Sequence, residues 1–213
     1  MAQRPVFVPG VRKNTPEVYR MEFEWNGGFA ASQKQKNIDA LHGAFLRRFP
    51  EKKVLEISSK SRDPLGVALS AFNLTLFLPE LGYAVPVECV FQGGKVFAAG
   101  GPYTDLYTKT SREAKKDSRL KTGGELRSFF FGGRNYPLMP RTAFYNWLYL
   151  NALLEHPKLG KALMEYDGFT DIEFNPDRSI NCQAEAAAVY VALARKGLAE
   201  QCRDFDRFLA LMK

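Results

Sequence analysis

Two long apolar segments in the C-terminal half constrain the fold of this chain most strongly. Residues 142–156 (TAFYNWLYLNALLEH) and 182–197 (CQAEAAAVYVALARKG) have the length of ordinary helices, and apolar side chains cover most of their surface. A helix that is apolar nearly all round is stable only when it is buried. The longest apolar run, AAAVYVALA, is far too short to cross a bilayer. We therefore predict two buried helices in a folded domain and no membrane insertion.

Shorter elements are expected around these two helices. Apolar side chains recur at helical spacing in 33–49, and Ser32 is placed to cap that helix. Further helices are expected at 110–120, 158–167 and 200–212, and strands at 18–25, 54–58, 67–77 and 169–174. Proline and glycine interrupt residues 1–22, which we expect to form an irregular lead-in. Helices dominate and no linker divides the chain, so we predict an α+β fold: a single helix-rich domain over 1–213 with a small β-sheet.

The composition favours an anionic partner and leaves little room for metal chemistry. The chain has 30 Lys and Arg against 23 Asp and Glu, a basic balance that favours polyanions. Its three cysteines form no CxxC pair and are too few for a disulfide framework, and its two histidines leave little room for a zinc site. We therefore expect no metal and no cofactor. The N-terminus lacks a charged-then-apolar signal segment, and we expect a cytoplasmic location.

Residues 87–97 (VECVFQGGKVF) place three polar side chains and two glycines in an apolar run. In a continuous helix, Glu88, Gln92 and Lys95 fall at i, i+4 and i+7, on one stripe. Two glycines in a helix interior cost about 1 kcal/mol each relative to alanine, which favours a close approach by a ligand or another backbone. This stretch is a candidate pocket wall. The alternative is an ordinary surface stripe, or a helix that ends at Gly93.

Other polar side chains stand where apolar ones are expected. Lys60 follows the apolar strand candidate VLEIS. Asp171 and Glu173 alternate within FTDIEF, so in a strand they share one face, where like-charge repulsion raises a carboxyl pKa. A solvent-facing edge is the alternative for these two acids. Asn181 is interpreted as the cap of the last buried helix.

The glycine-rich segments match no nucleotide-binding motif. FQGGKV lacks the GxxxxGK[ST] frame of a P-loop, and GGPYTD and FGGRNY lack GxGxxG after a strand. In GGPYTDLY, Tyr103 is placed to stack on a ligand and Asp105 to hydrogen-bond to one; a plain turn is the alternative.

A set of sequence blocks lies within residues 23–198: GFAASQKQKNIDALH, VLEISSKS, LGVALSAFNL, PVECVFQGGKVF, GGPYTDLY, YPLMPRTAFYNWLYLNAL, YDGFTDIEFNP and SINCQAEAAAVYVALARKGL. Together these blocks resemble the NADAR superfamily, and most closely its branch associated with DarT-type DNA ADP-ribosyltransferase toxins. The family's glutamate and lysine fall on Glu88 and Lys95. The sequence departs from more distant members at Ala71, where they carry asparagine, and at Cys89, where they carry histidine, and the late LG pair is missing.

This resemblance implies hydrolysis of an N-glycosidic bond at C1 of the distal ribose of ADP-ribose. For the toxin-linked branch it implies removal of ADP-ribose from guanine in DNA, single-stranded by preference, and a DarT-type toxin as partner. Cleavage builds positive charge on the ribose, so Glu88 is expected to stabilise that charge and activate water. A lysine amine is expected to form a Schiff base with the opened sugar, with Lys60 preferred over Lys95.

The resemblance also implies a set of substrate contacts. Stacking on adenine is expected from Phe72, Tyr103 or Trp147, and contacts to ribose hydroxyls from Asp105 and Asp171. The full set of expected substrate-binding residues is Phe72, Asn73, Gln92, Lys95, Tyr103, Asp105, Asp171 and Asn181.

Two other functions stay open at this point. One is an N-glycosidase of the same fold that acts on a small phosphoribosyl metabolite of the riboflavin-pathway type. The other is a non-catalytic antitoxin that binds ADP-ribosylated DNA or the toxin without cleaving a bond.

Overall fold

The computed structural model describes residues 1–177 and 179–213. A four-stranded sheet, with strand order β2-β1-β9-β3, is built from both ends of the chain. Strands β1 (Ala2–Val8) and β2 (Glu17–Phe23) form an antiparallel hairpin, and β9 (Gly168–Thr170) runs parallel to β3 (Val54–Glu56). This sheet therefore brings the segment that follows residue 170 next to the segment that follows residue 56.

The predicted irregular lead-in over 1–22 is wrong, because β1 occupies Ala2–Val8 and β2 begins at Glu17. All seven residues of β1 pair with β2, and Val6, Phe7 and Val8 are buried. Pro5 and Pro9 make the stretch read as a loop, but burial of the apolar side chains and the continuous register outweigh that local signal. The strands predicted at 18–25 and 54–58 are confirmed as β2 and β3.

Helix α1 (Ala31–Arg48) confirms the helix predicted at 33–49 and packs on the hairpin. Its predicted cap is wrong: Ala30 occupies the N-cap position, with no side-chain hydrogen bond. Lys34, in the first turn, forms an ion pair of 3.2 Å with Glu173. This carboxylate offsets the cost of placing a lysine at the positive end of the helix dipole.

The two long apolar segments form the central helices, as predicted. Helices α6 (Ala143–Glu155) and α8 (Gln183–Arg195) pack against each other and are buried along most of their length. Tyr149 of α6 is fully buried and donates a hydrogen bond of 2.7 Å to the carbonyl of Leu69. The pair thus lies within the larger hydrophobic core, and a second apolar cluster lies between α1 and the β1–β2 hairpin.

Shorter C-terminal helices surround this pair. Helix α7 (Pro157–Leu163) confirms the helix predicted at 158–167. The helix predicted at 200–212 is divided into a 3-10 turn, η2 (Ala199–Arg203), and α9 (Phe205–Leu211). The division falls at Asp204, whose side chain caps α9 by accepting a hydrogen bond from the backbone N–H of Arg207 at 2.8 Å.

The strand predicted at 67–77 is wrong over most of its length. Asp63 accepts a hydrogen bond from the backbone N–H of Leu65 and starts α2 (Pro64–Ala68), with proline in the first turn. Aspartate followed by proline is a strong helix-start signal, and it outweighs the apolar run behind it. Only β4 (Thr75–Leu78) is extended there, and it pairs with β5 (Tyr83–Pro86).

The remaining elements form a unit around α3 (Val87–Gly93). A three-stranded sheet has the order β6-β7-β8, from β6 (Lys95–Phe97), β7 (Leu126–Phe131) and β8 (Arg134–Tyr136). Between β6 and β7 lie the 3-10 turn η1 (Thr104–Thr108), α4 (Ser111–Lys116) and α5 (Arg119–Thr122). The helix predicted at 110–120 is thus confirmed as helical but broken after Lys116.

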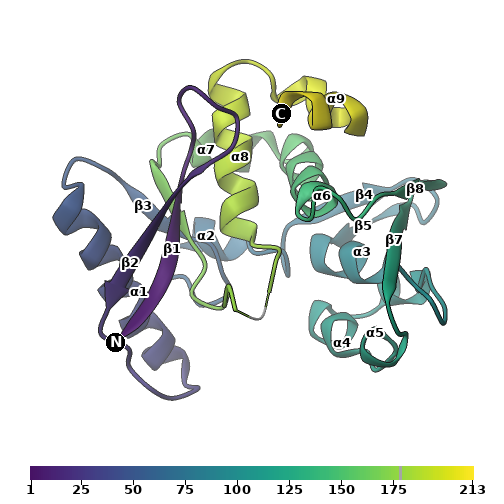
Figure 1. Cartoon of the computed structure of the whole chain (residues 1–213), viewed down its shortest axis with the longest axis horizontal. Coiled ribbons are helices and arrows are strands. Elements are labelled where there is room, and N and C mark those ends of the chain that lie inside the picture. The colour runs from purple at the N-terminus through teal and green to yellow at the C-terminus, as the bar shows by residue number, and fades with distance from the viewer. Residues whose placement is uncertain (178) are drawn as a thin grey trace.

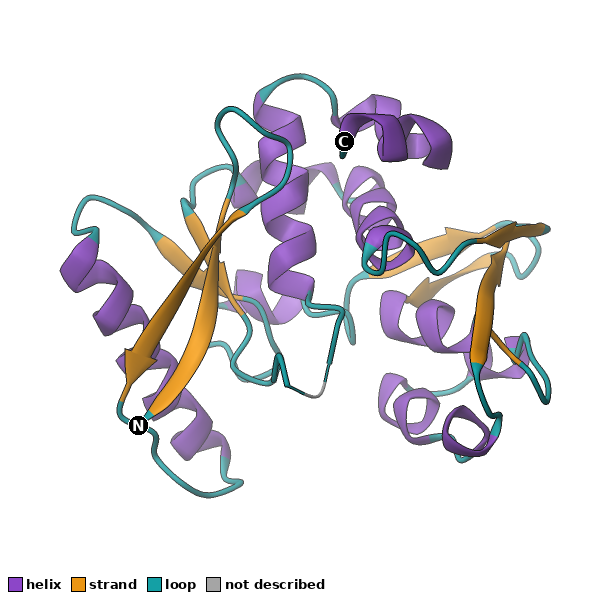
Figure 2. Ribbon diagram, in the orientation of Figure 1, coloured by secondary structure: helices purple, strands orange, loops and turns teal. Residues whose placement is uncertain are grey.

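Figure 1 shows the N-terminal sheet and α1 on the left, α6 to α9 in the upper middle, and α3 to α5 with β7 and β8 on the right. Figure 2 shows that helices dominate and that the strands fall into small separate sheets, which confirms the α+β class. Among the residues that the structure describes, no helix is both long and apolar enough to span a bilayer. The loop before α8 and the helices α3 and α4 face each other across the lower middle of the molecule.

Candidate active site

A cavity of about 930 Å³ lies between these facing elements. Its walls come from the β3–α2 and α2–β4 connections, α3 with β6, α4, β7, and the two loops that lead into α6 and α8. Of the residues predicted from sequence, those that line it are Lys60, Phe72, Glu88, Gln92, Lys95, Asp171 and Asn181. Residues as far apart as 60 and 181 therefore meet around one space.

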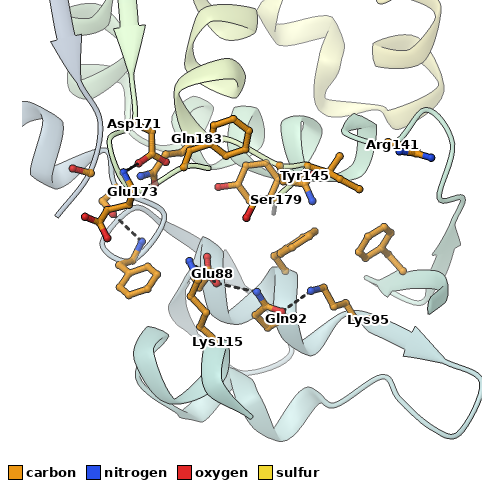
Figure 3. A pocket seen from close by; sticks show the side chains of 18 of the residues that line it. Glu88, Gln92, Lys95, Lys115, Arg141, Tyr145, Asp171, Glu173, Ser179 and Gln183 are labelled. Atoms are coloured by element: carbon orange, nitrogen blue, oxygen red, sulfur yellow. Dashed lines mark hydrogen bonds and ion pairs between the residues drawn. The ribbon is translucent and has the colours of Figure 1, made fainter. Parts of the chain in front are cut away.

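Glu88 presents its carboxylate to this cavity from the first turn of α3 (Figure 3). The residue is 6% exposed, and its backbone N–H donates to the carbonyl of Ala71 at 2.9 Å. Its Oε1 accepts a hydrogen bond of 2.9 Å from Gln92, and the Lys115 ammonium lies 3.9 Å away. The carboxylate is thus held in place by the hydrogen bond from Gln92, with a cation close by.

Gln92 joins Glu88 to Lys95, but not on the continuous helix that we predicted. Helix α3 ends at Gly93, so Lys95 belongs to strand β6. Its ammonium donates a hydrogen bond of 2.7 Å to Oε1 of Gln92 and lies 4.8 Å from the centre of the Phe91 ring. Burial, only partly opposed by the charge of Glu88, lowers the pKa of Lys95 to about 8.

The two glycines after Gln92 are required by close packing and not by a ligand. A Cβ on Gly93 would lie 2.5 Å from the Tyr107 ring, and one on Gly94 would lie 2.9 Å from the carbonyl oxygen of Phe130. Gly94 also accepts a hydrogen bond from the backbone N–H of Phe130, at 2.7 Å. The glycine pair lets α3 turn directly into the edge of the β6-β7-β8 sheet.

Asp171 faces the cavity from the side opposite Glu88 (Figure 3). The strand predicted over 169–174 is wrong beyond Thr170, where β9 ends. Asp171 and Glu173 instead lie in a turn, in which Oδ1 of Asp171 accepts the backbone N–H of Glu173 at 3.0 Å. Burial, followed by repulsion from Glu56, raises the pKa of Asp171 to about 8. The direction of the pKa shift is the one that we predicted from repulsion between Asp171 and Glu173, but its principal cause is burial.

Glu56 is a second buried acid beneath this turn, and sequence reasoning missed it. It is 2% exposed and accepts hydrogen bonds from the Thr170 hydroxyl at 2.6 Å and the backbone N–H of Ile172 at 2.8 Å. His42 Nε2 lies 2.8 Å from the same hydroxyl, and burial lowers the pKa of His42 to about 4. Burial also raises the pKa of Glu56, so the Glu56–Asp171 pair retains a proton near neutral pH.

Four of the predicted substrate contacts do not line the cavity. Asn73 is exposed and donates to the carbonyl of Val67 at 2.8 Å. Tyr103 packs on Phe97, and Asp105 is held by Arg119 in an ion pair of 2.7 Å. Trp147 is likewise a core side chain that donates to the carbonyl of Arg203 at 3.3 Å. These residues stabilise the fold around the site, and the structure does not bring them together with Glu88.

Asn181 lines the cavity, but its predicted role as a cap is wrong. The N-cap of α8 is Cys182, without a side-chain hydrogen bond. Oδ1 of Asn181 is buried and accepts no hydrogen bond within residues 1–177 and 179–213. A buried carbonyl oxygen of this kind favours a donor from a ligand or water.

Gln183 clips three parts of the site together, a role that its sequence position did not reveal. Its Oε1 accepts the backbone N–H of Ala71 at 2.7 Å, and its Nε2 donates to the carbonyl of Ile57 at 2.6 Å. Ala71 in turn accepts the backbone N–H of Glu88. The first residue of α8 therefore fixes both the Lys60 segment and the start of α3.

Further cavity residues were not singled out from sequence. They include Arg112 and Lys115 of α4, Arg141 and Tyr145 near the start of α6, and Ser179 before α8. The basic run in α4 and the RTAFYNW start of α6 were visible as composition, but nothing in the sequence places them beside Glu88. Burial raises the pKa of Tyr145 well above its ordinary value, so its hydroxyl remains a hydrogen-bond donor.

The electrostatics of the cavity favour an anionic ligand. Four lining cations, Lys60, Lys95, Arg112 and Arg141, form no ion pair within the described part of the chain. Cations left unpaired around a cavity raise the local concentration of anions. Within residues 1–177 and 179–213, no group of three or more His, Cys, Asp or Glu side chains is arranged to hold a metal ion.

Comparison with known proteins places the chain in a family. No curated protein matches it. A family model described as the DarT1-associated NADAR antitoxin matches residues 2–213, almost the entire chain. The chain therefore belongs to the family of DarT1-associated NADAR antitoxins.

Proposed function

We propose that the protein is an ADP-ribosyl glycohydrolase that removes ADP-ribose from guanine bases in DNA and so acts as antitoxin to a DarT-type toxin. The observation that carries this proposal is the buried Glu88 carboxylate, presented to a large cavity whose other lining charges are mostly unpaired cations. Family membership supplies the antitoxin role and the toxin partner.

The size and charge of the cavity fit a nucleotide diphosphate sugar. Its volume of about 930 Å³ lies at the upper end of the range usual for small-molecule sites. The unpaired cations Lys95 and Arg141 both lie toward the right of the view in Figure 3, at different heights, and the acids Asp171 and Glu173 lie toward its left. Cations suit the diphosphate and carboxylates suit ribose hydroxyls, so the two ends are suited to different parts of one ligand.

Glu88 supplies the chemistry that this bond requires. As the bond between C1 of the ribose and the exocyclic guanine nitrogen lengthens, positive charge develops on the sugar, and a nearby carboxylate stabilises it. Glu88 takes a proton from the water whose oxygen attacks C1. The guanine nitrogen leaves with a proton from the Asp171–Glu56 pair, which holds one near neutral pH. Free ADP-ribose and unmodified guanine are the products.

A lysine amine offers a second route to the same products, and Lys95 suits it better than Lys60. The ribose opens to an imine between C1 and the guanine nitrogen, and the amine adds to C1. The guanine amine departs with a proton, and water hydrolyses the lysine imine that remains. Because the pKa of Lys95 is lowered to about 8, on the order of a tenth of it is the neutral amine at pH 7.

Release of ADP-ribose from a defined substrate tests the proposal. The purified protein is incubated with a single-stranded oligonucleotide that carries one ADP-ribosylated guanine, and with small phosphoribosyl compounds as comparison substrates. We expect free ADP-ribose and an unmodified oligonucleotide. Faster turnover of the small compounds would favour the metabolite N-glycosidase. Tight binding of the oligonucleotide without release would favour a sequestering antitoxin.

A further inference from the structure

The segment from Lys109 to Lys121 concentrates the positive charge of the chain. It holds six basic and two acidic side chains, a net charge of +4 against +7 for the whole chain. Five of its basic residues form what we term the basic ridge: Lys109, Arg112, Lys115, Lys116 and Lys121. The ridge runs along α4 and into α5, at the lower right of Figure 1.

The ridge keeps its charge because the acids nearby are engaged elsewhere. Glu113 accepts the backbone N–H and hydroxyl of Thr110 in a capping box. Asp117 accepts hydrogen bonds of 2.9 Å from Arg119, which is therefore not counted in the ridge. Within the part of the chain that the structure describes, Lys115 is the one ridge residue whose side chain lies within 4 Å of a carboxylate oxygen, that of Glu88 at 3.9 Å.

The ridge begins at the rim of the cavity and leads away from it. Ser111 and Ala114 are buried, and α4 packs on α3 through this side. Arg112 and Lys115 line the cavity, and Figure 3 shows Lys115 rising from α4 toward Glu88. Lys109, Lys116 and Lys121 are exposed and lie outside the cavity. An anion that filled only the cavity would leave these three lysines without a contact.

We infer that the basic ridge binds the phosphate backbone of the DNA strand next to the modified guanine, while the ADP-ribosyl group occupies the cavity. This inference rests on the proposed function and adds to it a site for the nucleic acid itself. A row of exposed cations is the usual footprint of a phosphate backbone, since each phosphate carries one charge and demands no fixed geometry. A single strand suits the ridge, because a stacked guanine could not enter the cavity.

The test separates strand binding from chemistry. The triple variant Lys109→Glu, Lys116→Glu, Lys121→Glu leaves every cavity residue in place. The matched control, Lys53→Glu, Lys158→Glu, Lys161→Glu, changes the net charge equally at exposed positions that lie outside the cavity and the ridge. Turnover is measured on the ADP-ribosylated oligonucleotide and on ADP-ribosylated guanosine, which has no backbone. Binding of a labelled, unmodified single strand is measured across a range of salt concentrations.

We expect kcat/KM of the ridge variant on the oligonucleotide to fall by about tenfold or more at low salt. Turnover of the nucleoside should stay at the wild-type level, and the control should behave as wild type on both substrates. The slope of log affinity against log salt should drop by roughly 2, since each lost single-strand phosphate contact removes about 0.7.

Three results would overturn the inference. Unchanged strand affinity and salt slope in the ridge variant would mean that the ridge does not meet DNA. An equal loss in the charge control would mean that net charge alone is responsible. Normal strand binding with lost affinity for the toxin would assign the ridge to a protein partner. If wild type cleaves neither substrate, the proposed function fails, and the binding measurement still decides the role of the ridge.

Discussion

The side-chain amide of Gln92 donates a hydrogen bond of 2.9 Å to Oε1 of Glu88. The oxygen of the same amide accepts a hydrogen bond from the Lys95 ammonium at 2.7 Å, so a neutral residue separates the buried acid from the half-buried base. A direct ion pair would stabilise the charged form of both groups. With Gln92 between them, the amine keeps a lowered pKa and the carboxylate remains open to the cavity.

The first prediction concerns the amine of Lys95. Because burial lowers its pKa to about 8, the nucleophilic neutral form is depleted below that pH, and the rate of a lysine-dependent route should rise as pH increases toward 8. Borohydride added during turnover should trap a covalent adduct in the wild type and in Lys60→Ala, and none in Lys95→Ala. Lys95→Arg, which remains charged, should also give no adduct.

Other trapping patterns would redirect the assignment. An adduct that disappears only in Lys60→Ala would identify Lys60 as the nucleophile. The absence of any adduct in an active wild type would leave attack by water, directed by Glu88, as the route.

The second prediction concerns the proton on Asp171. Its pKa in the folded protein, about 8, lies above its ordinary value of 3.8, so the folded state holds a proton that the unfolded state loses. This contribution to stability is therefore lost as pH rises from about 4 to 8. Asp171→Asn cannot ionise, so its melting temperature relative to wild type should increase from pH 5 to pH 8. Activity of the wild type should also decline above pH 8, where the acid is ionised.

Glu56→Gln provides the companion variant. Removing the negative charge beside Asp171 should lower the pKa of Asp171 and move the alkaline decline in activity to lower pH. A change in rate without any shift of the pH profile would show that Glu56 only supports the turn through Thr170 and Ile172. A relative melting temperature of Asp171→Asn that is independent of pH would contradict the buried proton.

The third prediction tests the packing behind α3. A Cβ at Gly93 would meet the Tyr107 ring at 2.5 Å, so Gly93→Ala should destabilise the protein by about 1–3 kcal/mol. That corresponds to a lower melting temperature by about 2–4 °C for each kcal/mol in a domain of this size. Gly27→Ala, where no atom lies within 4 Å of an added Cβ, should be close to neutral. Equal stability of the two variants would show that Gly93 is not tightly packed.

Features governed by local periodicity were predictable from the sequence. The buried helices α6 and α8 were predictable because apolar side chains cover nearly their whole surface. The shared orientation of Glu88 and Gln92 was predictable because they lie four residues apart in one helix. The proximity of Lys95 to this pair was predicted correctly, but from a continuous helix that does not exist. Helix α3 ends at Gly93, and Lys95 reaches Gln92 from strand β6.

Features governed by long-range pairing were not predictable. The hairpin of β1 and β2 depends on register between residues whose local sequence favours a loop. The proximity of Glu56 to Asp171 depends on the parallel pairing of β3 with β9. This pairing joins Glu56 to Thr170, which is 114 positions further along the chain. Tyr103 and Asp105 have side chains that could bind a ligand, but Tyr103 packs on Phe97 and Asp105 forms an ion pair with Arg119. Residue type alone does not tell such structural contacts from ligand contacts.

The role of Glu88 is tested most directly by single-turnover release of ADP-ribose from a guanine-ADP-ribosylated oligonucleotide, compared between wild type and Glu88→Gln. Glutamine keeps the size of the side chain and one oxygen that can accept the hydrogen bond from Gln92, while it removes the charge. We predict that release slows by about 10²–10⁴-fold, with substrate affinity and melting temperature close to those of wild type. Release by Glu88→Gln at the wild-type rate would contradict the account.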